Sequence, residues 1–469
     1  MYKIKFGTDG WRAVIADQFT VDNITRVSWA ISQWLQNKHP EPIVVVGYDT
    51  RFGGKMFAET VAKVLAIKGT KVLLAPDFVS TPMVSLGVLQ LKAHLGIMIT
   101  ASHNPPVYNG IKLKGVHGGP LEKQELQVIE GLIPDSSEIN LLAFKWDESL
   151  QHEKIRYADL EQLYYKHIIN HFDIETLKKR KFKIAFDAMY GAGQRILPRI
   201  LPDVVQVHCH PDPMFGNIPP EPVPGKLMEF IEILKRRTSI DIGIAVDGDA
   251  DRIALVDKKG RYVDSHHIIL LLIHYLAGYK KMKGKVVTGF STTVKAEVLC
   301  QHYGLEIQRV PIGFKEISAV MKKEPVLVGG EESGGISILT HIPERDGIWM
   351  GLTILEAMSE TGKSLRELID EVYKITGSFA YARADLQLGQ DKIQAVMKRC
   401  MENGFDRFGP FEVSHTIAFD GYKFFFNDHE WLMIRASGTE PLLRTYAEAE
   451  TPERVDEILK AAYETMEVV

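Results

Sequence analysis

Ser102, in a short polar turn, is the residue of this sequence with the clearest potential as a nucleophile. It lies in the run TASHNP at residues 100–105, directly after the apolar segment Leu95–Ile99. An apolar extended segment that ends in a polar turn with proline predicts a buried strand followed by a loop. Because ligands bind at the carboxyl edge of open α/β sheets, this placement favours a functional serine. Ser, Asn and Pro are also ordinary turn residues, so the motif alone leaves a purely structural turn as the alternative.

Three aspartates alternate along a second loop and predict a site for a divalent cation. Asp247, Asp249 and Asp251 form the run DGDADR directly after an apolar segment. Three carboxylates this close repel one another unless a cation neutralises them, and Mg²⁺ prefers such oxygen ligands. A calcium EF-hand loop is excluded, because its sixth position would need Gly and is Arg252, and its twelfth would need Glu and is Lys258. A solvated acidic turn is the alternative.

A third loop, GGEESGG at residues 329–335, combines glycines with polar groups that suit a polyhydroxy ligand. The glycines allow a tight backbone turn, while Glu331, Glu332 and Ser333 offer carboxylate and hydroxyl groups. By itself this loop is read more simply as a flexible connection. Shortly after it, before another predicted helix, the run HIPERDG brings together three polar residues: His341, Arg345 and Asp346.

The fourth loop, RASGTEP, has the composition of a phosphate cradle. Arg435 supplies charge, and Ser437 and Thr439 supply hydroxyls. The backbone near Gly438 supplies amide donors, and these three kinds of group together suit a phosphate dianion. Arg444 adds a second guanidinium nearby in the sequence. A solvated turn is the alternative.

The elements that must position these loops follow a repeated pattern. In three blocks of the chain an apolar strand, a turn of small residues, a helix and a second strand follow in order, starting at 43–46, 183–186 and 285–287. Such units indicate similar α/β domains, and the tail predicts a separate α+β domain. The predicted domains are 1–150 with the serine loop, 151–258 with the metal loop, 259–376 with the sugar loop and 377–469 with the phosphate loop.

The composition is that of a soluble globular protein, with 45% hydrophobic and 25% charged residues. The 56 basic and 60 acidic side chains give a net charge of −4, which offers no general attraction to nucleic acid or to a membrane surface. Cys209, Cys300 and Cys400 lie far apart without a CxxC spacing, which argues against a disulfide framework and favours a reducing compartment. The sequence starts without the apolar segment of a signal peptide, so we expect a cytoplasmic protein.

The four loops together, in this order, resemble those of the α-D-phosphohexomutases, the family that includes phosphoglucomutases and phosphomannomutases. Two further runs add to the resemblance, FGTDGWR near the start and YNGIKLK after the serine loop. The resemblance covers nearly the full chain, and TASHNP together with DGDADR is its most specific part. It implies three similar α/β domains with mixed sheets and a C-terminal α+β domain, arranged around a central cleft.

The resemblance implies one group of residues for phosphoryl transfer. Ser102 corresponds to the serine that carries a phosphoryl group, and its oxygen joins the three aspartates in holding Mg²⁺. Lys112 falls on the lysine proposed as general acid/base, and Arg12 on an arginine near the transferring phosphate. The implied catalytic residues are Ser102, Lys112, Arg12 and His103, and the implied metal ligands are Ser102, Asp247, Asp249 and Asp251.

The resemblance implies a second group of residues for substrate binding. Glu331 and Ser333 match the pair that holds sugar hydroxyls, and the loop that begins at Arg435 matches the one that grips the phosphate that does not react. Arg345 and Lys315 are further candidates. The implied substrate-binding residues are Glu331, Ser333, Arg345, Arg435, Ser437, Gly438, Thr439 and Lys315.

These roles predict an isomerase that interconverts hexose 1-phosphate and hexose 6-phosphate. The route implied is through phospho-Ser102 and a hexose 1,6-bisphosphate, with glucose 1,6-bisphosphate as activator. Relatives specialised for mannose or glucosamine phosphates carry His at the end of the sugar loop and Met or Gln before its serine, whereas this chain has Gly335 and Glu332. We therefore expect a preference for glucose with mannose as a second sugar, and a phosphoglucosamine mutase is the alternative.

Two further alternatives come from other functional classes. One is a phosphotransferase in which Asp247, after its apolar strand, acts as the nucleophile. The other is a sugar-phosphate sensor without catalysis, although this chain keeps both the serine and the aspartates that a degenerate relative would lose first. The expected partners are small sugar phosphates only, and the expected assembly is a monomer or a small homo-oligomer.

Overall fold

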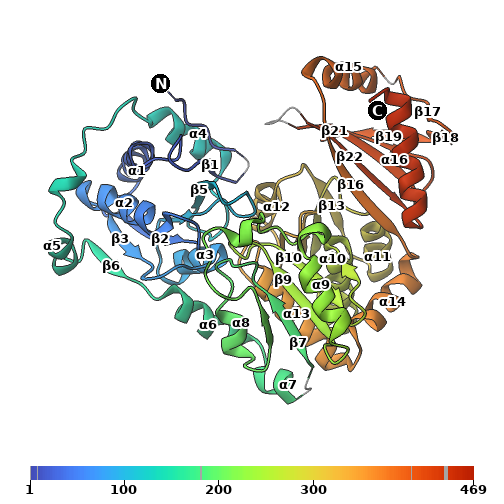
Figure 1. Cartoon of the computed structure of the whole chain (residues 1–469), viewed down its shortest axis with the longest axis horizontal. Helices are drawn as coiled ribbons and strands as arrows, with labels where there is room; N and C mark the ends of the chain where they lie inside the picture. Colours follow the sequence, from blue (N-terminus) through green and yellow to red (C-terminus); the bar gives the residue numbers. More distant parts are fainter. Residues whose placement is uncertain (1, 8, 180–181, 403, 438–441, 469) are drawn as a thin grey trace.

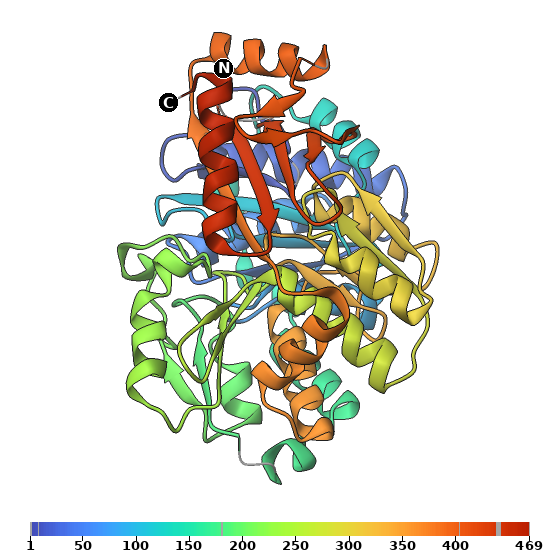
Figure 2. The same ribbon diagram turned by 90° about the vertical axis from the view of Figure 1, so that its right-hand side faces the viewer.

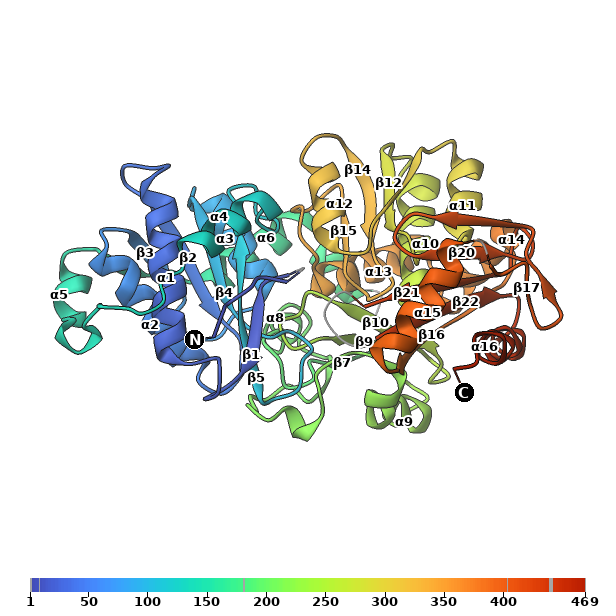
Figure 3. The same cartoon turned by 90° about the horizontal axis from the view of Figure 1, so that it is seen from above.

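The chain folds into four units that follow one another along the sequence in the computed structural model, which describes residues 2–7, 9–179, 182–402, 404–437 and 442–468 (Figure 1). The blue amino-terminal unit and the red carboxyl-terminal unit lie at opposite ends of the long axis, with the green and yellow units between them in Figures 1 and 3. The predicted fold class is confirmed, because three α/β units with mixed sheets precede an α+β unit.

The first unit is a six-stranded mixed sheet between two layers of helices. Alternate residues of its strands face two different cores: Val44 and Val46 pack with the α1 and α2 layer, and Val45 packs with the α3 layer. The strand order is β1 (Trp11–Val14), β5 (Tyr108–Lys114), β4 (Leu95–Ile99), β2 (Ile43–Tyr48), β3 (Lys71–Leu74) and β6 (Ile155–Tyr157). The helices are α1 (Val21–Gln36), α2 (Gly54–Ile67), α3 (Thr81–Gln90), α4 (Lys123–Leu132) and α5 (Trp146–Gln151). Since β6 pairs with β3 in parallel, this sheet continues past residue 150.

The second unit is a five-stranded mixed sheet. Its strand order is β11 (Tyr262–Val263), β10 (Ile253–Asp257), β9 (Ile242–Val246), β7 (Ile184–Asp187) and β8 (Val205–Val207). Its helices are α6 (Leu160–His171), α7 (Ile174–Lys179), α8 (Ile196–Ile200) and α9 (Met228–Arg236). The central strand β9 is buried along its whole length, as an apolar run between two helical layers should be.

The third unit is a four-stranded mixed sheet. Its strand order is β13 (Ile307–Val310), β12 (Lys285–Gly289), β14 (Val326–Gly330) and β15 (Ile336–Ile338). Its helices are α10 (Ser265–Ile273), α11 (Lys295–Tyr303), α12 (Phe314–Met321), α13 (Gly347–Thr361) and α14 (Leu365–Thr376). Helix α13 begins at the turn HIPERDG, where Asp346 accepts a hydrogen bond from the amide of Trp349 as its N-cap.

The three α/β units share one local device, an antiparallel hairpin added to a parallel part of the sheet. β4, β9 and β14 each run parallel to a neighbour on one side and antiparallel to the following strand on the other. The turns of these hairpins contain the serine loop, the metal loop and the sugar loop. All three sheets therefore present a polar loop at the carboxyl end of a fully buried strand.

The fourth unit is a five-stranded sheet that is antiparallel throughout. Its strand order is β16 (Ala380–Gln387), β22 (Leu442–Ala449), β21 (Trp431–Ala436), β20 (Tyr422–Phe425) and β19 (His415–Ala418), with a short pair β17 (Arg407–Phe408) and β18 (Phe411–Glu412) beside it. Its helices are α15 (Gln390–Met401) and α16 (Pro452–Met466). Helix α16 lies along the sheet (Figure 2) and starts with Thr451 as N-cap and Pro452 in its first turn. None of the helices in the described parts of the chain is long and apolar enough to cross a bilayer.

Candidate active site

Ser102 sits in the turn between β4 and β5 and is almost fully buried, with 1% of its surface exposed. Its φ of 53° is a left-handed conformation that residues other than glycine rarely adopt. Its amide donates to Thr100 Oγ1 (2.8 Å), and its hydroxyl donates to Asp247 Oδ2 (2.7 Å). Backbone strain of this kind concentrates at functional sites, and here it accompanies a direct contact with the aspartate loop of the second unit.

Arg51, which the sequence analysis did not single out, holds the serine turn in place. Its Nη2 donates to the carbonyls of Ser102 (2.5 Å) and Asn104 (2.7 Å), and its Nη1 donates to two carbonyls further along the turn. Asp49 lies 3.3 Å from Nε and is equally buried. Burial raises the pKa of Asp49 to about 6 even beside this guanidinium. The serine is therefore positioned by a buried ion pair beneath its own loop.

The three aspartates of the metal loop lie together. Asp247, Asp249 and Asp251 are fully buried, and one carboxylate oxygen of each lies within 4.8 Å of the others. Burial and the two neighbouring carboxylates raise the pKa of Asp247 well above its usual value. Oδ1 of Asp249 and Oδ1 of Asp251 have no hydrogen-bond partner among the described residues. Buried oxygens without a donor are costly, and a hard divalent cation would satisfy them, so these residues fit Mg²⁺.

Lys112 of β5 is the amine that lies among these carboxylates. Its Nζ is 2.7 Å from Asp249 Oδ2, 2.8 Å from Asp251 Oδ2 and 2.9 Å from Asp9 Oδ2. Burial opposes the charged amine, but the three carboxylates outweigh it and hold the pKa of Lys112 above its usual value. Asp9 is not among the residues predicted from the sequence, and its place in the run FGTDGWR is the signal that could have identified it.

Arg345 joins the metal loop to the sugar loop. Its Nη2 pairs with Asp251 Oδ2 at 2.6 Å and also with Asp9, while its Nη1 lies 4.0 Å from Glu331 Oε2. A Cβ atom added at Gly335 would lie 2.3 Å from Arg345 Cδ, so a side chain at that position would push the arginine away. Glycine in the sugar loop is thus needed for Arg345 to reach the aspartates.

The sugar loop presents Glu331 and Ser333 next to this arginine. Glu331 Oε1 accepts a hydrogen bond from the amide of Gly313 (2.9 Å), and burial raises the pKa of Glu331 to about 7. Ser333 is half-buried. Lys315 is half-buried in the first turn of α12, and no hydrogen bond or ion pair within the described residues joins it to the sugar loop. The structure therefore brings Glu331, but not Lys315, into direct contact with the rest of the cluster.

Backbone hydrogen bonds fasten the metal loop to the sugar loop of the third unit and to the start of α3 in the first unit. The Ile253 amide, just after the metal loop, donates to the Gly334 carbonyl of the sugar loop (3.1 Å). The Thr81 amide of the first unit donates to the Asp249 carbonyl (3.0 Å), and Thr81 Oγ1 donates to Asp249 Oδ2. Because backbone groups make these two contacts, the position of the metal loop against the sugar loop and against α3 does not depend on long side chains alone.

Arg12 lies beside the serine turn, and His103 is part of it. Arg12 Nη1 donates to Asn104 Oδ1 (2.6 Å) within that turn. Burial, with the positive charges of Arg252 and Arg12, holds the pKa of His103 well below its usual value. The imidazole of His103 is therefore uncharged at neutral pH, and the guanidinium of Arg12 is the cationic group of this pair.

The described part of the phosphate loop lies on the fourth unit, apart from this cluster. Arg435, at the end of β21, pairs through Nε with Asp420 Oδ1 (3.1 Å). The Ser437 amide donates to the carbonyl of the first residue of β22 (2.9 Å). Gly438 and Thr439 lie outside the described residues. Within the described chain, no hydrogen bond or ion pair joins Arg435 to the serine, metal or sugar loop.

The contacts of His341, in the run HIPERDG, are structural ones at the start of α13. Its Nε2 lies 2.8 Å from Asp346 Oδ2, and its ring stacks on Trp349 with centroids 3.9 Å apart. Asp346 also accepts hydrogen bonds from the Tyr164 hydroxyl (2.7 and 2.8 Å). These contacts fix the start of α13 against α6, and the His341 side chain is fully buried.

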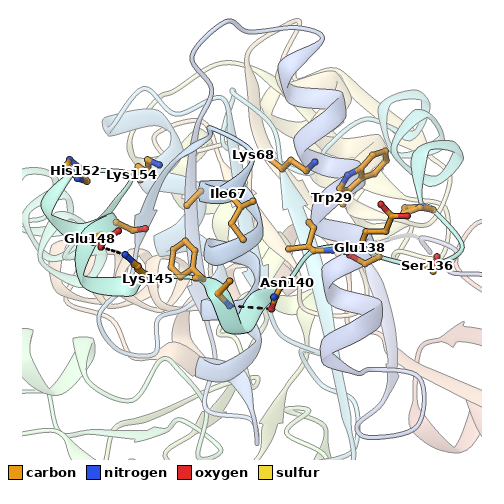
Figure 4. Close-up of a pocket in the computed structure, with 17 residues that line it drawn as sticks. Trp29, Ile67, Lys68, Ser136, Glu138, Asn140, Lys145, Glu148, His152 and Lys154 are labelled. Carbon is orange, nitrogen blue, oxygen red and sulfur yellow. Dashed lines mark hydrogen bonds and ion pairs between the residues drawn. The ribbon is translucent and has the colours of Figure 1, made fainter.

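A pocket of 940 Å³ lies elsewhere, between α1, α2 and the segment 134–154 (Figure 4). Figure 4 shows Trp29 and Lys68 on one side of it and Lys145 on the other. Lys68 follows α2 and precedes β3, so the pocket adjoins the amino-terminal edge of the sheet. Ser102 follows β4, which is parallel to the same neighbour as β3, and therefore lies at the opposite edge. The pocket is separate from the candidate active site.

The comparisons with known proteins agree over the whole chain. Models of phosphoglucomutase/phosphomannomutase match it as α/β/α domain I at residues 3–140, domain II at 162–260, domain III at 264–375 and the C-terminal domain at 387–465. It is 32% identical to a phosphoglucomutase/phosphomannomutase from Thermococcus kodakarensis, with 98% of each chain covered. It is 31% identical to a phosphoglucosamine mutase from Methanocaldococcus jannaschii, with 97% of this chain and 96% of that protein covered. The solved structure of a protein from Thermus thermophilus assigned as a phosphomannomutase is 33% identical, with a TM-score of 0.87 and 99% of both chains covered.

Proposed function

Because the chain belongs to the phosphoglucomutase/phosphomannomutase family of isomerases, we propose that it interconverts hexose 1-phosphate and hexose 6-phosphate through phospho-Ser102. The observation that carries this proposal is the contact of 2.7 Å between the Ser102 hydroxyl and Asp247, next to two further buried aspartates. Phosphoryl transfer is governed by positioning and by neutralisation of charge, and a serine oxygen beside a set of cation ligands provides both.

In the proposed cycle, phospho-Ser102 gives its phosphoryl group to the free reacting hydroxyl of the bound hexose phosphate. The P–O bond to Ser102 breaks, a P–O bond to the sugar forms, and the sugar hydroxyl loses its proton. The hexose 1,6-bisphosphate then turns around and returns its other phosphoryl group to Ser102. Lys112 is the candidate general acid/base: its charged Nζ contacts the same aspartate loop that Ser102 contacts, and it would donate a proton to the departing Ser102 oxygen and regain one from the sugar hydroxyl.

The residues around Ser102 would neutralise the negative charge of the transferring phosphate. The three aspartates and the Ser102 oxygen would hold Mg²⁺, which when bound supplies Lewis-acid stabilisation of the transferring phosphate. Arg12 reaches the serine turn, and Arg345 reaches Asp251, so both add positive charge where a phosphate would lie. These charges are fixed before substrate arrives, which is the arrangement that favours electrostatic stabilisation.

Two grips would hold the sugar phosphate. Glu331 and Ser333 would bind sugar hydroxyls, and Arg435 with Ser437 would bind the phosphate that does not react. Since the bisphosphate has a phosphate at each end, Arg435 and Ser437 would bind the phosphate that does not react in both halves of the cycle. Closure of the fourth unit on the substrate would exclude water and limit hydrolysis of phospho-Ser102.

The proposed sugar is glucose, with mannose as a second substrate. The preference rests on Glu332 and Gly335 in the sugar loop, and a side chain at position 335 would also displace Arg345. Glucosamine phosphate is the second candidate, because the chain is 31% identical to a protein named as a phosphoglucosamine mutase. A coupled assay with glucose 1-phosphate, mannose 1-phosphate and glucosamine 1-phosphate, each with glucose 1,6-bisphosphate as activator, separates them. The highest kcat/KM on glucosamine 1-phosphate would overturn the proposed preference.

The nucleophile is tested by mass spectrometry and by substitution. The purified protein incubated with glucose 1,6-bisphosphate should carry phosphate on Ser102, and Ser102→Ala should lose turnover. Ser136→Ala, at an exposed serine, is the matched control and should keep wild-type activity. Full turnover by Ser102→Ala in the presence of activator would contradict the assignment.

The same preparations decide the two other functional classes. A beryllium fluoride adduct on Asp247, with no phosphate on Ser102, would indicate an aspartate nucleophile. Binding of glucose 6-phosphate at saturating Mg²⁺ and activator, without any isomerisation of the three sugars, would indicate a sensor.

A further inference from the structure

The tip of the hairpin between β19 and β20 touches both the third unit and the arginine of the phosphate loop. Its acidic residue, Asp420, uses both carboxylate oxygens: Oδ1 accepts from Arg435 Nε (3.1 Å) and Oδ2 accepts from the Ile312 amide (2.7 Å). Beside it, the ring of Phe419 packs edge-on against Phe290 of the third unit, with centroids 5.6 Å apart. One short turn therefore joins two units and one candidate substrate ligand.

The backbone of this turn lies directly against the strand that carries Arg435. Gly421 has φ 112°, a conformation that favours glycine. A Cβ atom added there would lie 2.9 Å from the Ile434 carbonyl oxygen and 3.1 Å from Arg435 Cβ. The tight fit sets the position of Asp420 relative to the arginine through the backbone, which makes the ion pair a defined geometry rather than a chance surface contact.

On the side of the third unit, the segment that receives Asp420 also contacts the sugar loop. The Ile312 amide donates to Asp420, and the next amide, that of Gly313, donates to Glu331 Oε1 (2.9 Å). The following residue, Phe314, lies under the guanidinium of Arg345 at 5.5 Å. Two successive amides thus bind two carboxylates, one beside the candidate phosphate arginine and one in the candidate sugar ligand itself.

We propose that Asp420 is a positioning residue that aims Arg435 at the phosphate that does not react and ties its placement, through Ile312 and Gly313, to Glu331. Asp420 binds only Nε of the guanidinium, and the terminal nitrogens still present a fork that suits a phosphate. The phosphate grip of the fourth unit and the sugar grip of the third unit are then set by one connected segment. This inference rests on the proposed function, because it takes Arg435 as a phosphate ligand.

A role in positioning predicts a different outcome from a role in holding the units together. The Asp420 and Arg435 side chains are 22% and 20% exposed, so solvent screens their ion pair in part, and we expect its contribution to stability to be modest. The orientation of the Arg435 guanidinium matters more for substrate binding, because a guanidinium that points away from the phosphate loses most of its charge-assisted hydrogen bond. We therefore expect substitutions at Asp420 to act on the KM for sugar phosphate and on phosphate affinity, with a small effect on kcat and on Tm.

The first experiment compares Asp420→Asn with Asp420→Ala. Asn keeps an acceptor for the Ile312 amide and removes the charge beside Arg435, so KM should rise about threefold to tenfold with kcat within about twofold. Ala removes both contacts and should raise KM by about tenfold or more. Asp428→Asn, at an exposed position of the same unit, is the matched control and should behave as wild type. An unchanged KM in both Asp420 variants would overturn the proposal.

The second experiment is a double-mutant cycle read by calorimetry with inorganic phosphate, which needs no turnover. Asp420→Asn should weaken phosphate binding by about threefold or more in the wild-type background and by less than about twofold in the Arg435→Lys background, because the two residues act as one unit. Equal factors in both backgrounds would show a general effect on the fold and would overturn the proposal. A wild-type protein that binds phosphate but isomerises no hexose phosphate would refute the proposed function while this cycle still tests Asp420.

Discussion

The serine, metal and sugar loops differ from the phosphate loop in how they are held. The first three occupy hairpin turns of three α/β sheets, and the aspartates of the metal loop are fully buried. A backbone hydrogen bond joins the metal loop to the sugar loop, and the Ser102 hydroxyl joins the serine loop to Asp247. Arg435 sits on an antiparallel sheet of another unit, is 20% exposed, and is held by one hairpin tip. Groups that must meet developing charge are fixed in advance in a buried cluster, whereas Arg435, which would meet the distant end of the substrate, has Asp420 as its described ion-pair partner.

This difference predicts that the buried loops serve the phosphoryl-transfer step and that the phosphate loop serves substrate binding. Among the buried loops, Lys112 and Arg345 each contact more than one carboxylate. Loss of one member should therefore disturb the transfer step. Arg435 shares Asp420 alone among its described ion-pair partners, so its loss should disturb binding and leave the transfer machinery intact.

The largest expected effect comes from the metal loop. Asp249→Asn should lower kcat by about 10³-fold or more, because it removes a charged cation ligand at the reacting centre, while substrate affinity stays within about threefold. Steady-state kinetics and calorimetry with Mg²⁺ on the variant measure the two parts. Removal of Mg²⁺ by a chelator should have the same effect on the wild type and should be reversed by adding the ion. A kcat within tenfold of wild type for Asp249→Asn would break the division between the two regions.

The next effect comes from the phosphate loop. A charge-assisted hydrogen bond is worth roughly 1.5 to 3 kcal/mol, so Arg435→Ala should raise KM by about 10-fold to 100-fold. Phosphate incorporation on Ser102 and Mg²⁺ affinity should stay as in the wild type, because the described contacts of Arg435 include neither Ser102 nor the three aspartates. Mass spectrometry and calorimetry check these two points. A variant with unchanged KM but impaired phosphorylation would place Arg435 with the buried loops instead.

A smaller effect on kcat is expected beneath the serine turn. Arg51→Lys keeps a positive charge next to Asp49 but loses the fork that binds carbonyls of the turn. We expect kcat to fall about tenfold with KM within about twofold, and the free energy of unfolding to fall by about 2 to 4 kcal/mol. Arg366→Lys, in an exposed pair on α14, is the control for the same exchange. Denaturant unfolding and kinetics measure both, and a change in KM alone would contradict a positioning role for Arg51.

The smallest effect concerns pH. Burial raises the pKa of Glu331 to about 7, so its carboxyl is protonated below that pH and loses the charge that accepts hydrogen bonds from sugar hydroxyls. The kcat/KM of the wild type should therefore rise as pH increases through about 7, and Glu331→Gln should flatten this rise. Ionisation of the substrate phosphate affects both proteins equally, so the ratio of the two profiles isolates Glu331. Superimposable profiles would remove Glu331 from substrate binding.

The part of the site that could be predicted from the sequence is the part that follows strands. Ser102 and Asp247 come directly after apolar segments, and strand ends of α/β sheets gather at one edge, so their meeting could be anticipated. Arg51 could not be assigned a role, because its partners are backbone carbonyls, which leave no trace in side-chain pattern. Asp420 lies in a run, FDGY, that reads as an ordinary turn, and its partners belong to another unit.

The fold class could also be predicted from the pattern of apolar strands. The residues at which each sheet begins and ends could not. The repeat of apolar strand, small turn and helix predicts α/β units whatever their contacts. The pairing of β6 with β3 depends on a chain that crosses back to the first sheet after residue 150, where a polar three-residue strand gives little signal. Boundaries between units are set by tertiary packing of such short elements, and local sequence holds little information on them.

The hairpins that carry the buried loops also constrain how this protein can change in length. In each, both flanking strands are paired in register, so a residue inserted in the metal loop would change the spacing of the three aspartates, because β9 and β10 are buried along their length and held in their pairing. Deletions would have the same effect. The exposed turn at 427–429, between β20 and β21, lies far from any such demand and should accept added residues, a tag or a circular break. Diversification of this chain is thus expected to proceed by substitution in the three buried loops and by insertion at the rim of the fourth unit.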